Sequence, residues 1–305
     1  MISVLARQVI SGVLVILMAL TLTFVLVRFS GDPTSLILSE DATAAQRALL
    51  RAKLGLDLPI WEQYLNYVLN AFQGEFGTSY FSNETVTEII LRHLPNTLWL
   101  GLAALGLAAA TAIPLGLASA VWKGGLIDRA VQVTAVLGSA MPSFWIGLML
   151  IQIFAIGLNW LPTFGTATWA HLVLPAFTLA LFAFPSLSRL TRSSMLDVLP
   201  QPYVMVARAK GMPETRVIGR TVLRNGIVPV ITLVALELGN LVGGAVLTET
   251  VFAWEGIGRL AVNSIQRRDF PVVQGVVAYV AFGFVLITLL ADIAIRIINP
   301  RLRSS

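Results

Sequence analysis

Residues 203–229, YVMVARAKGMPETRVIGRTVLRNGIVP, form the only long polar and basic run in the second half of the chain. Its basic side chains are Arg208, Lys210, Arg216, Arg220 and Arg224, and its one acid is Glu214. Apolar segments long enough to cross a bilayer flank it on both sides. The run therefore connects two predicted membrane spans.

Turn-forming residues divide this run into two predicted short helices. Gly211-Met212-Pro213 lies inside the run and Asn225-Gly226 ends it. Pro suits the first turn of a helix, and Gly suits the position just past a helix end. We therefore expect helices at about Tyr203–Lys210 and Pro213–Arg224 that meet at Gly211. The alternative is a solvated basic loop, and the ordered spacing of Gly and Pro favours a helical elbow that a soluble partner can grip.

The composition is that of a helical integral membrane protein. Of 305 residues, 56% are hydrophobic and only 12% are charged, about half the charged share of an ordinary soluble protein. The uncharged runs are too long for barrel strands. The chain has no Cys, which excludes disulfides, thiolate metal sites and a Cys nucleophile. The net charge of +5 is explained by where the basic residues lie, so no nucleic-acid partner is expected.

Six apolar runs predict an all-α fold of six transmembrane helices with a small helical extracytoplasmic subdomain between the first two. The predicted spans are Val9–Val27, Leu94–Val121, Ala130–Leu158, Leu172–Ser188, Gly226–Thr248 and Phe270–Ala291. The predicted divisions are a first helix (1–29), the subdomain (30–93) and a five-helix core (94–305), with the elbow at 195–225. The subdomain has a helix-forming stretch at Ala42–Leu54 and then apolar residues at helical spacing around Trp61 and Phe72.

The charge distribution predicts which side each loop faces. With six spans and the N-terminus inside, the inner segments hold most Lys and Arg, and the segment 28–93 is rich in acids. Positively charged loops stay in the cytoplasm. We therefore expect both termini and the elbow to be cytoplasmic, and the first span to be a retained helix because its apolar run is longer than a signal-peptide core.

Catalytic and metal-binding patterns are missing from the sequence. His93 and His171 lie at the predicted external ends of spans and are interpreted as ordinary polar groups. The chain has no nucleotide-binding motif and no intramembrane carboxylate pair. We therefore expect a non-catalytic chain that binds no metal and no cofactor of its own, and an intramembrane enzyme is disfavoured.

Glu237 is the one carboxylate well inside a predicted span. A charge at the bilayer centre costs about 3 kcal/mol on insertion scales, so we expect it to face a cavity or a partner. Asn240 lies one turn away, and Gly239-x-x-x-Gly243 fits close helix association. These residues are predicted to lie on the translocation pathway or at a subunit interface, and the sequence favours neither over the other.

The elbow and several other stretches of the sequence resemble a known protein family. The elbow, with Ala207, Ala209 and Gly211, resembles the cytoplasmic EAA loop of ABC importer permeases, and YVMVARAKGM…VLRNGIVPVIT resembles their dipeptide, oligopeptide and nickel class. Further matching stretches run through nearly the whole chain: SGDP, MPSFWIGLML, WLPTFG, HLVLPAFTLAL, SRLTRSSMLDV, GGAVLTETVFAWEGIGRL, RRDFPVVQGVV and NPRLR. Met205 departs from the loop's usual Glu, Glu255 departs from a usual Pro, and Pro229 lies farther from Gly211 than in the general motif.

The resemblance implies a permease subunit of the bacterial inner membrane. Such a chain pairs with a second, related permease within the lipid and carries di- or oligopeptides that a solute-binding protein delivers; the alternative cargo is nickel or a metal chelate. Two cytoplasmic ATP-binding subunits would hold ATP and Mg²⁺. The resemblance assigns coupling to those ATPases to Ala207, Arg208, Ala209, Lys210, Gly211 and Met212. The competing class is a stand-alone secondary transporter or channel, which predicts an inverted repeat or ion-coupled charges; the sequence has no convincing repeat.

Overall fold

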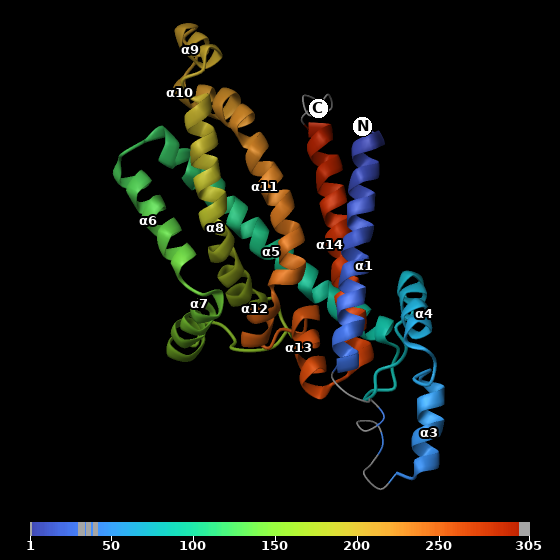
Figure 1. The fold of residues 1–305 in the computed structure, drawn as a ribbon. Coiled ribbons are helices and arrows are strands. Elements are labelled where there is room, and N and C mark those ends of the chain that lie inside the picture. Colours follow the sequence, from blue (N-terminus) through green and yellow to red (C-terminus); the bar gives the residue numbers. More distant parts are fainter. Residues whose placement is uncertain (1, 30–33, 35–37, 39–41, 299–305) are drawn as a thin grey trace. The chain divides into compact units, whose positions relative to one another are not determined.

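The computed structural model describes residues 2–29, 34, 38 and 42–298, and the side chains of 2–6, 240–244, 292 and 294–298 fall outside that description. Helices make up the regular structure of the described residues, and the one β contact among them is an isolated bridge between Thr78 and Thr85 (Figure 1). The predicted all-α membrane fold is confirmed.

The helices follow one another with short connections. In chain order they are α1 (Ile2–Phe29), α3 (Ala44–Lys53), α4 (Ile60–Gln73), α5 (Val86–Val121), α6 (Leu126–Ala140), α7 (Ser143–Leu150), the π-helix η1 (Ile151–Gly157), α8 (Ala170–Val198), α9 (Pro202–Ala209), α10 (Glu214–Arg216), the π-helix η2 (Val217–Val222), α11 (Leu223–Gly244), α12 (Val246–Val251), α13 (Ile257–Arg267) and α14 (Phe270–Ile298).

Among the residues that the structure describes, five helices are long and apolar enough to cross a membrane, and a sixth span depends on a bent pair. The predicted straight span Ala130–Leu158 is instead two helices, α6 and α7–η1, that meet at 105°. Met141 is extended (φ −96°, ψ 133°) and Pro142 caps α7. Because a residue before Pro is pushed out of the helical region, α6 ends at Ala140.

The chain forms two compact units, Met1–Thr97 with Glu255–Leu286, and Leu98–Trp254 with Ile287–Ser305. This division differs from the predicted one, in which 94–305 formed a single core. The reason is packing inside the first unit. Val86 and Ile90 are fully buried in one cluster with Ile257 and Val276, so α13 and the start of α14 belong with the start of α5. For the same reason α5 starts at Val86, earlier than the predicted Leu94.

Within the first unit, α1 and α14 pack closely. A Cβ on Gly12 would lie 2.5 Å from Val285 Cγ1, and Leu20 shares a buried cluster with Ala278 and Ala71 of α4. Gly12 thus pairs with the later part of α14 and Leu20 with its earlier part, so the two helices run antiparallel (Figure 1). The predicted external loop after the fifth span contains the helix α13.

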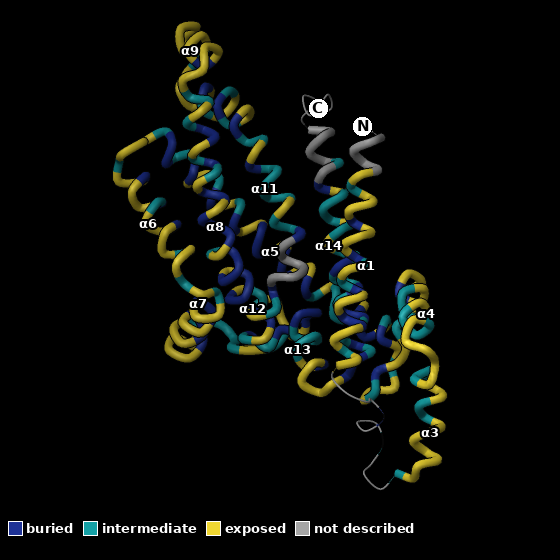
Figure 2. Tube along the Cα trace, in the orientation of Figure 1, coloured by how far each residue is buried: buried dark blue, intermediate teal, exposed yellow. Residues whose placement is uncertain are grey.

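Within the second unit, α5 and α8 run parallel. Gly116 approaches Ser188 and Thr191 near one end, and Leu100 clusters with Ala176 near the other. Parallel neighbours need a returning segment between them in the chain, and α6 with α7–η1 lies in that place. Figure 2 shows buried backbone along α8 and exposed backbone over α9.

Candidate functional site

The elbow is built as a helix, a tight turn and a second helical arm. Pro202 opens α9, and Lys210 ends it by donating its N–H to the Val206 carbonyl at 3.0 Å. Gly211 follows with φ 74°, a left-handed conformation that L side chains rarely adopt. Met212 donates back to the Ala207 carbonyl at 3.3 Å. The turn at Gly211 therefore has the geometry that the Gly-Met-Pro sequence predicts.

The second arm is longer than predicted. The expected separate helix Pro213–Arg224 continues through α10, η2 and α11 as one apolar helix, counted as a span over Glu214–Gly239. Asn225-Gly226 does not stop it. A Cβ on Gly226 would lie 2.6 Å from Met195 Sδ, so this glycine allows close packing on α8 rather than ending a helix.

The base of the elbow is fixed by a buried apolar cluster. Val204, Val217 and Val222 are fully buried together with Met195 and Ala120. These residues come from α9, the second arm, α8 and α5, so four helices share one core. Fully burying side chains of this size contributes about 1.5–3 kcal/mol each. The elbow is thus tied to the helices beneath it.

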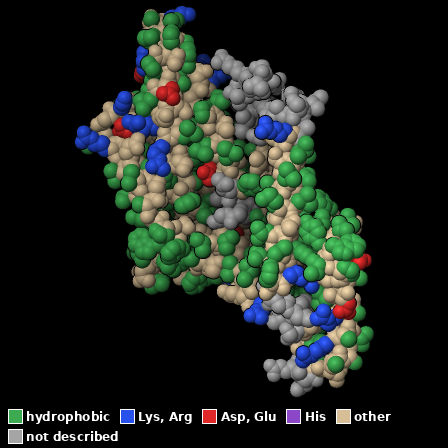
Figure 3. Space-filling model, viewed as in Figure 1, with side chains coloured by type: hydrophobic (Ala, Val, Ile, Leu, Met, Phe, Trp, Pro, Cys, Tyr) green, Lys and Arg blue, Asp and Glu red, His purple; other side chains and the backbone are tan. Residues whose placement is uncertain are grey.

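The predicted coupling residues divide between this base and an exposed tip. Ala207 and Met212 are half-buried and pack against the cluster. Arg208, Ala209, Lys210 and Gly211 are exposed, and nothing lies within 4 Å of a Cβ built on Gly211. Figure 3 shows Lys and Arg side chains gathered over this end of the second unit. The tip is free to meet a partner surface.

An ion pair closes the turn of the elbow. Arg208 donates to Glu214 from Nη2 at 2.7 Å and from Nε at 3.1 Å. The hydrogen bonds to Glu214 raise the pKa of Arg208. Both side chains are exposed, and exposed ion pairs add little stability. The pair therefore mainly orients the two arms around Gly211.

A buried carboxylate network lies at the α5–α6 turn, and sequence analysis missed it. Asp128 is 5% exposed and accepts hydrogen bonds from Ser119 Oγ (2.6 Å), the Gly124 N–H (2.8 Å) and Arg192 Nε and Nη2 (2.8 and 2.9 Å). In the sequence Asp128 was one of several charges in a short turn. Only the antiparallel packing of α6 on α8 brings Arg192 to it, so no local spacing signals the pair.

The predicted pathway residues are only partly described. Glu237 is half-buried in α11 and has no hydrogen bond or ion pair to the described residues. Gly239 is buried, whereas the burial of Asn240 and Gly243 lies outside the description. Leu233, Val234 and Leu238 pack against the α5–α8 core. Among the described side chains Glu237 has no partner, and both predicted roles stay open.

The two histidines are bound locally. His93 Nδ1 lies 2.8 Å from the Ile89 carbonyl, and His171 Nδ1 lies 2.8 Å from Thr168 Oγ1. Among the described residues no group of three His, Cys, Asp or Glu side chains is placed to hold a metal ion. Each histidine thus has a hydrogen-bonding contact within four residues of its own position.

Comparison with known proteins identifies the class. Residues 112–304 match the family model described as binding-protein-dependent transport system inner membrane component, and residues 1–101 match the model of its N-terminal region. The solved MetNI methionine ABC transporter in an inward-facing conformation (SeMet soak crystal form) matches with a TM-score of 0.59 at 17% identity, over 69% of this chain and 96% of that one. The chain belongs to the family of binding-protein-dependent transport system inner membrane components and is an ABC importer permease subunit.

Two named relatives are more similar in sequence to this chain than the solved transporter is. The glutathione transport system permease protein GsiC of Salmonella typhimurium is 42% identical over 273 residues, which cover 90% of this chain and 89% of that protein. The GsiC protein of Pectobacterium atrosepticum is 41% identical over 290 residues, covering 94% of each. The similarity extends along nearly the full length of both chains.

Proposed function

We propose that this chain forms half of the translocation pathway of an ATP-driven importer of short peptides. Family membership gives the permease role, and the relatives are glutathione permeases, whose named cargo is a tripeptide. This favours short peptides, including glutathione, over the nickel or metal-chelate alternative. The chain pairs with a second permease and receives cargo from a solute-binding protein outside the membrane.

The exposed tip on a buried base carries the proposed coupling role. Two cytoplasmic ATPase subunits hold ATP and Mg²⁺, and their motion reaches this chain through residues 207–212. Any force on the tip is passed to α8 and α11, because Val204, Val217 and Met195 share one core. Coupling of this kind needs a compact element joined rigidly to the elements it moves.

The Asp128 network extends the rigid base. It joins the end of α5, the start of α6 and the last turns of α8 through four hydrogen bonds. Arg192 lies one helical turn from Met195 of the elbow base. The network therefore keeps the three helices together when the elbow is pushed or pulled.

The proposed orientation has both termini and the elbow in the cytoplasm and the 30–93 segment outside, in a bacterial-type inner membrane. The segregated basic residues support it. The antiparallel course of α1 and α14 agrees with two termini on one side of the membrane, and the charges indicate which side that is.

The experiment that tests the coupling role is copurification of the ATPase subunits with the variant Gly211→Trp. We expect the variant to insert normally but to lose most of the bound ATPase, because its indole fills the space where the partner approaches. Gly211→Ala should keep part of it. Gly74→Trp is the matched control, since Gly74 also has a positive φ (79°) and the nearest atom to an added Cβ is Tyr279 Oη at 4.0 Å, but it is predicted on the opposite side of the membrane. Full ATPase recovery with Trp at 211 would contradict the proposal.

A further inference from the structure

Three kinds of side chain occupy three sides of the helix α4. One side packs on α1 and α14 through Tyr64, Tyr67 and Ala71. A second side is polar and carries Gln63, Asn66 and Asn70. The third side is apolar and exposed, and it consists of Trp61, Leu65, Leu69 and Phe72. Residues three and four apart lie on one face of a helix, so these last four residues form a continuous surface, which we call the α4 stripe.

The α4 stripe exposes large apolar side chains that bulk water would disfavour. Each of its four residues is at least 48% exposed. Single exposed apolar residues are ordinary on protein surfaces, whereas a contiguous apolar surface bordered by polar residues marks a contact with a protein partner or a membrane. The stripe is therefore expected to meet another surface.

Contacts with α1 place α4 alongside a membrane span. The hydroxyl groups of Tyr64 and Thr21 lie 2.7 Å apart, and the ring centroids of Tyr64 and Phe24 lie 5.4 Å apart. Both α1 residues belong to the apolar span Arg7–Phe29. Thr21 precedes the last residue of that span by about 12 Å of helix. The helix α4 thus lies beside the C-terminal half of α1 and not beyond its end (Figure 1).

Contacts with α14 lead to the same placement. The Phe72 ring of the stripe meets the Phe282 ring edge-on, with 5.6 Å between the centroids. Phe282 belongs to the apolar span Phe270–Ala291. Leu286 lies one turn further along the same face of α14 and is itself exposed. The α4 stripe therefore continues onto the exposed apolar surface of a membrane span.

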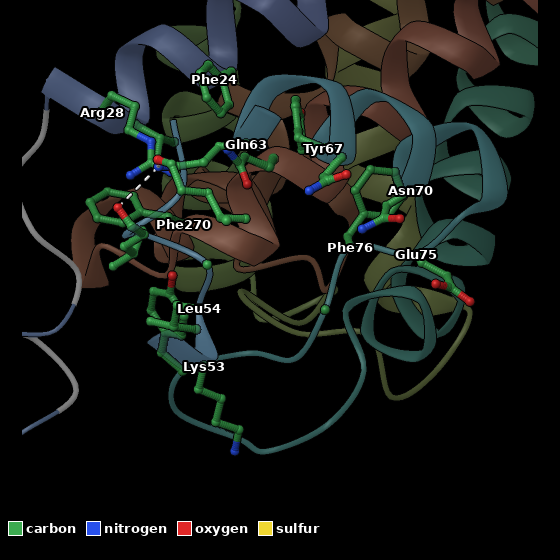
Figure 4. A pocket seen from close by; sticks show the side chains of 18 residues that line it. Phe24, Arg28, Lys53, Leu54, Gln63, Tyr67, Asn70, Glu75, Phe76 and Phe270 are labelled. Carbon is green, nitrogen blue, oxygen red and sulfur yellow. Dashed lines mark hydrogen bonds between the residues drawn. The ribbon is translucent and has the colours of Figure 1, made fainter. Parts of the chain in front are cut away.

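The polar side of α4 faces a cavity of about 410 Å³. Figure 4 shows the side chains of Gln63 and Asn70 at the wall of this cavity. The exposed residues Lys53 and Glu75 lie around the same cavity. Charged side chains are costly in hydrocarbon, so this side of α4 is expected to face water. One polar side and one apolar side on a single helix are typical of a helix that lies in a membrane interface.

We propose that α4 lies in the outer interface of the membrane, where the α4 stripe contacts the acyl chains of lipid. Packing on α1 and α14 holds the helix at that depth, and Trp61 suits the headgroup level, where Trp is enriched. A lipid surface is favoured over a protein partner because the stripe is continuous with the exposed surface of a span. The proposal goes beyond the proposed function, since it holds for any cargo.

Nitroxide labels on single cysteines test this placement in the assembled importer, with Cys-free partner subunits, in vesicles of phosphatidylethanolamine and phosphatidylglycerol. Oxygen concentrates among acyl chains and nickel–EDDA in water, so the ratio of their collision rates with a label reports its surroundings. We expect this ratio to be about tenfold higher at Leu65 and Leu69 than at Asn66 and Asn70, because only the stripe faces lipid. A label at Leu49, an exposed leucine of α3, should give the low ratio.

A ratio at Leu65 and Leu69 no higher than that at Asn66 and Asn70 would overturn the proposal, because the stripe would then be solvated. Low collision rates of both reagents at Leu65 and Leu69 would overturn it as well, because a protein would then cover the stripe. An impermeant maleimide should still reach single cysteines of α4 from outside, about tenfold more slowly at Leu65 than at Asn66, since α4 lies at the membrane surface.

The wild-type chain provides a second measurement that needs no substitution. Phosphatidylcholine with a diazirine in its acyl chain is added to the same vesicles and illuminated, and the attached peptides are mapped by mass spectrometry. We expect adducts on peptides that contain the α4 stripe and none on peptides of α3. Absence of adducts on α4 would contradict the proposed lipid contact.

Discussion

Asp128 shows how one residue can join three helices. Its carboxylate accepts from Ser119, Gly124 and Arg192, which lie on α5, in the α5–α6 turn and on α8. The Arg192 side chain is 22% exposed, so water reaches one partner of the pair. The network is therefore expected to hold geometry more than to add a large free energy.

Asp128→Asn removes the charge that Arg192 requires. We expect the free energy of unfolding to fall by about 1–3 kcal/mol, since a hydrogen-bonded charge loses its partner. Thermal unfolding of the detergent-solubilised chain measures this. Arg192→Gln and the double variant complete the cycle, and the double variant should cost less than the sum of the singles. Additive losses would show that the two side chains do not act as a pair.

Glu237→Gln distinguishes the two roles left open for Glu237. If Glu237 lies on the translocation pathway, its charge faces the cargo route. Glu237→Gln should then assemble normally with the second permease but change uptake. If Glu237 lies at the subunit interface, Glu237→Gln should lower the pull-down yield of the second permease. Leu236→Ala, at an exposed neighbouring position of α11, serves as the control for changes to the helix surface. Unaltered uptake together with unaltered assembly would exclude both roles.

At the scale of elements, the sequence predicts the existence of the helices better than their ends. Apolar runs identify the spans, and Gly211 with Pro213 predicts the turn of the elbow. The bend at Pro142 was not predicted, because Pro is tolerated inside a membrane helix when neighbours satisfy the freed groups. Asn225-Gly226 was misinterpreted as a helix end. Its glycine is required by the approach of Met195, a contact between helices that no local pattern reveals.

Two glycines of α5 offer a matched test of its packing on α8. A Cβ on Gly116 would lie 2.7 Å from Thr191 Cβ and 2.8 Å from the Ser188 carbonyl oxygen, whereas nothing lies within 4 Å of one on Gly106. Gly116→Ala should destabilise the chain by about 1–3 kcal/mol, as overpacking does. Gly106→Ala should be neutral or stabilising by up to about 1 kcal/mol, because Ala is the better helix former. Thermal unfolding compares them, and equal effects would contradict the close packing of α5 on α8.

At the scale of the whole molecule, the sequence predicts the class but not the grouping of helices into units, and the orientation that it indicates stays a prediction. The distribution of charges and the number of apolar runs depend only on residue types along the chain, so the sequence alone provides them. The association of α13 and α14 with the start of α5 depends on contacts between residues far apart in sequence, such as Val86 with Val276. The candidate site divides in the same way. Its tip was predicted, and its anchoring network at Asp128 was not.

Topology is testable directly because the chain has no Cys. Single cysteines in Ala42–Asn70 should react with a membrane-impermeant maleimide in intact cells. Single cysteines in Tyr203–Asn225, including one at Glu214, should react only after the membrane is permeabilised. Labelling of position 214 from outside intact cells would reverse the proposed orientation.

The most direct test of the central claim is photo-crosslinking from the elbow tip in living cells. A photoreactive residue in place of Ala209, which is exposed and bears no charge, should form an adduct with a cytoplasmic ATPase subunit. The same residue in place of Ala42, in the segment predicted to lie outside, should form none with that subunit. An elbow residue that captures no ATPase, or that captures an external protein instead, would contradict the account of this chain as a permease driven through its elbow.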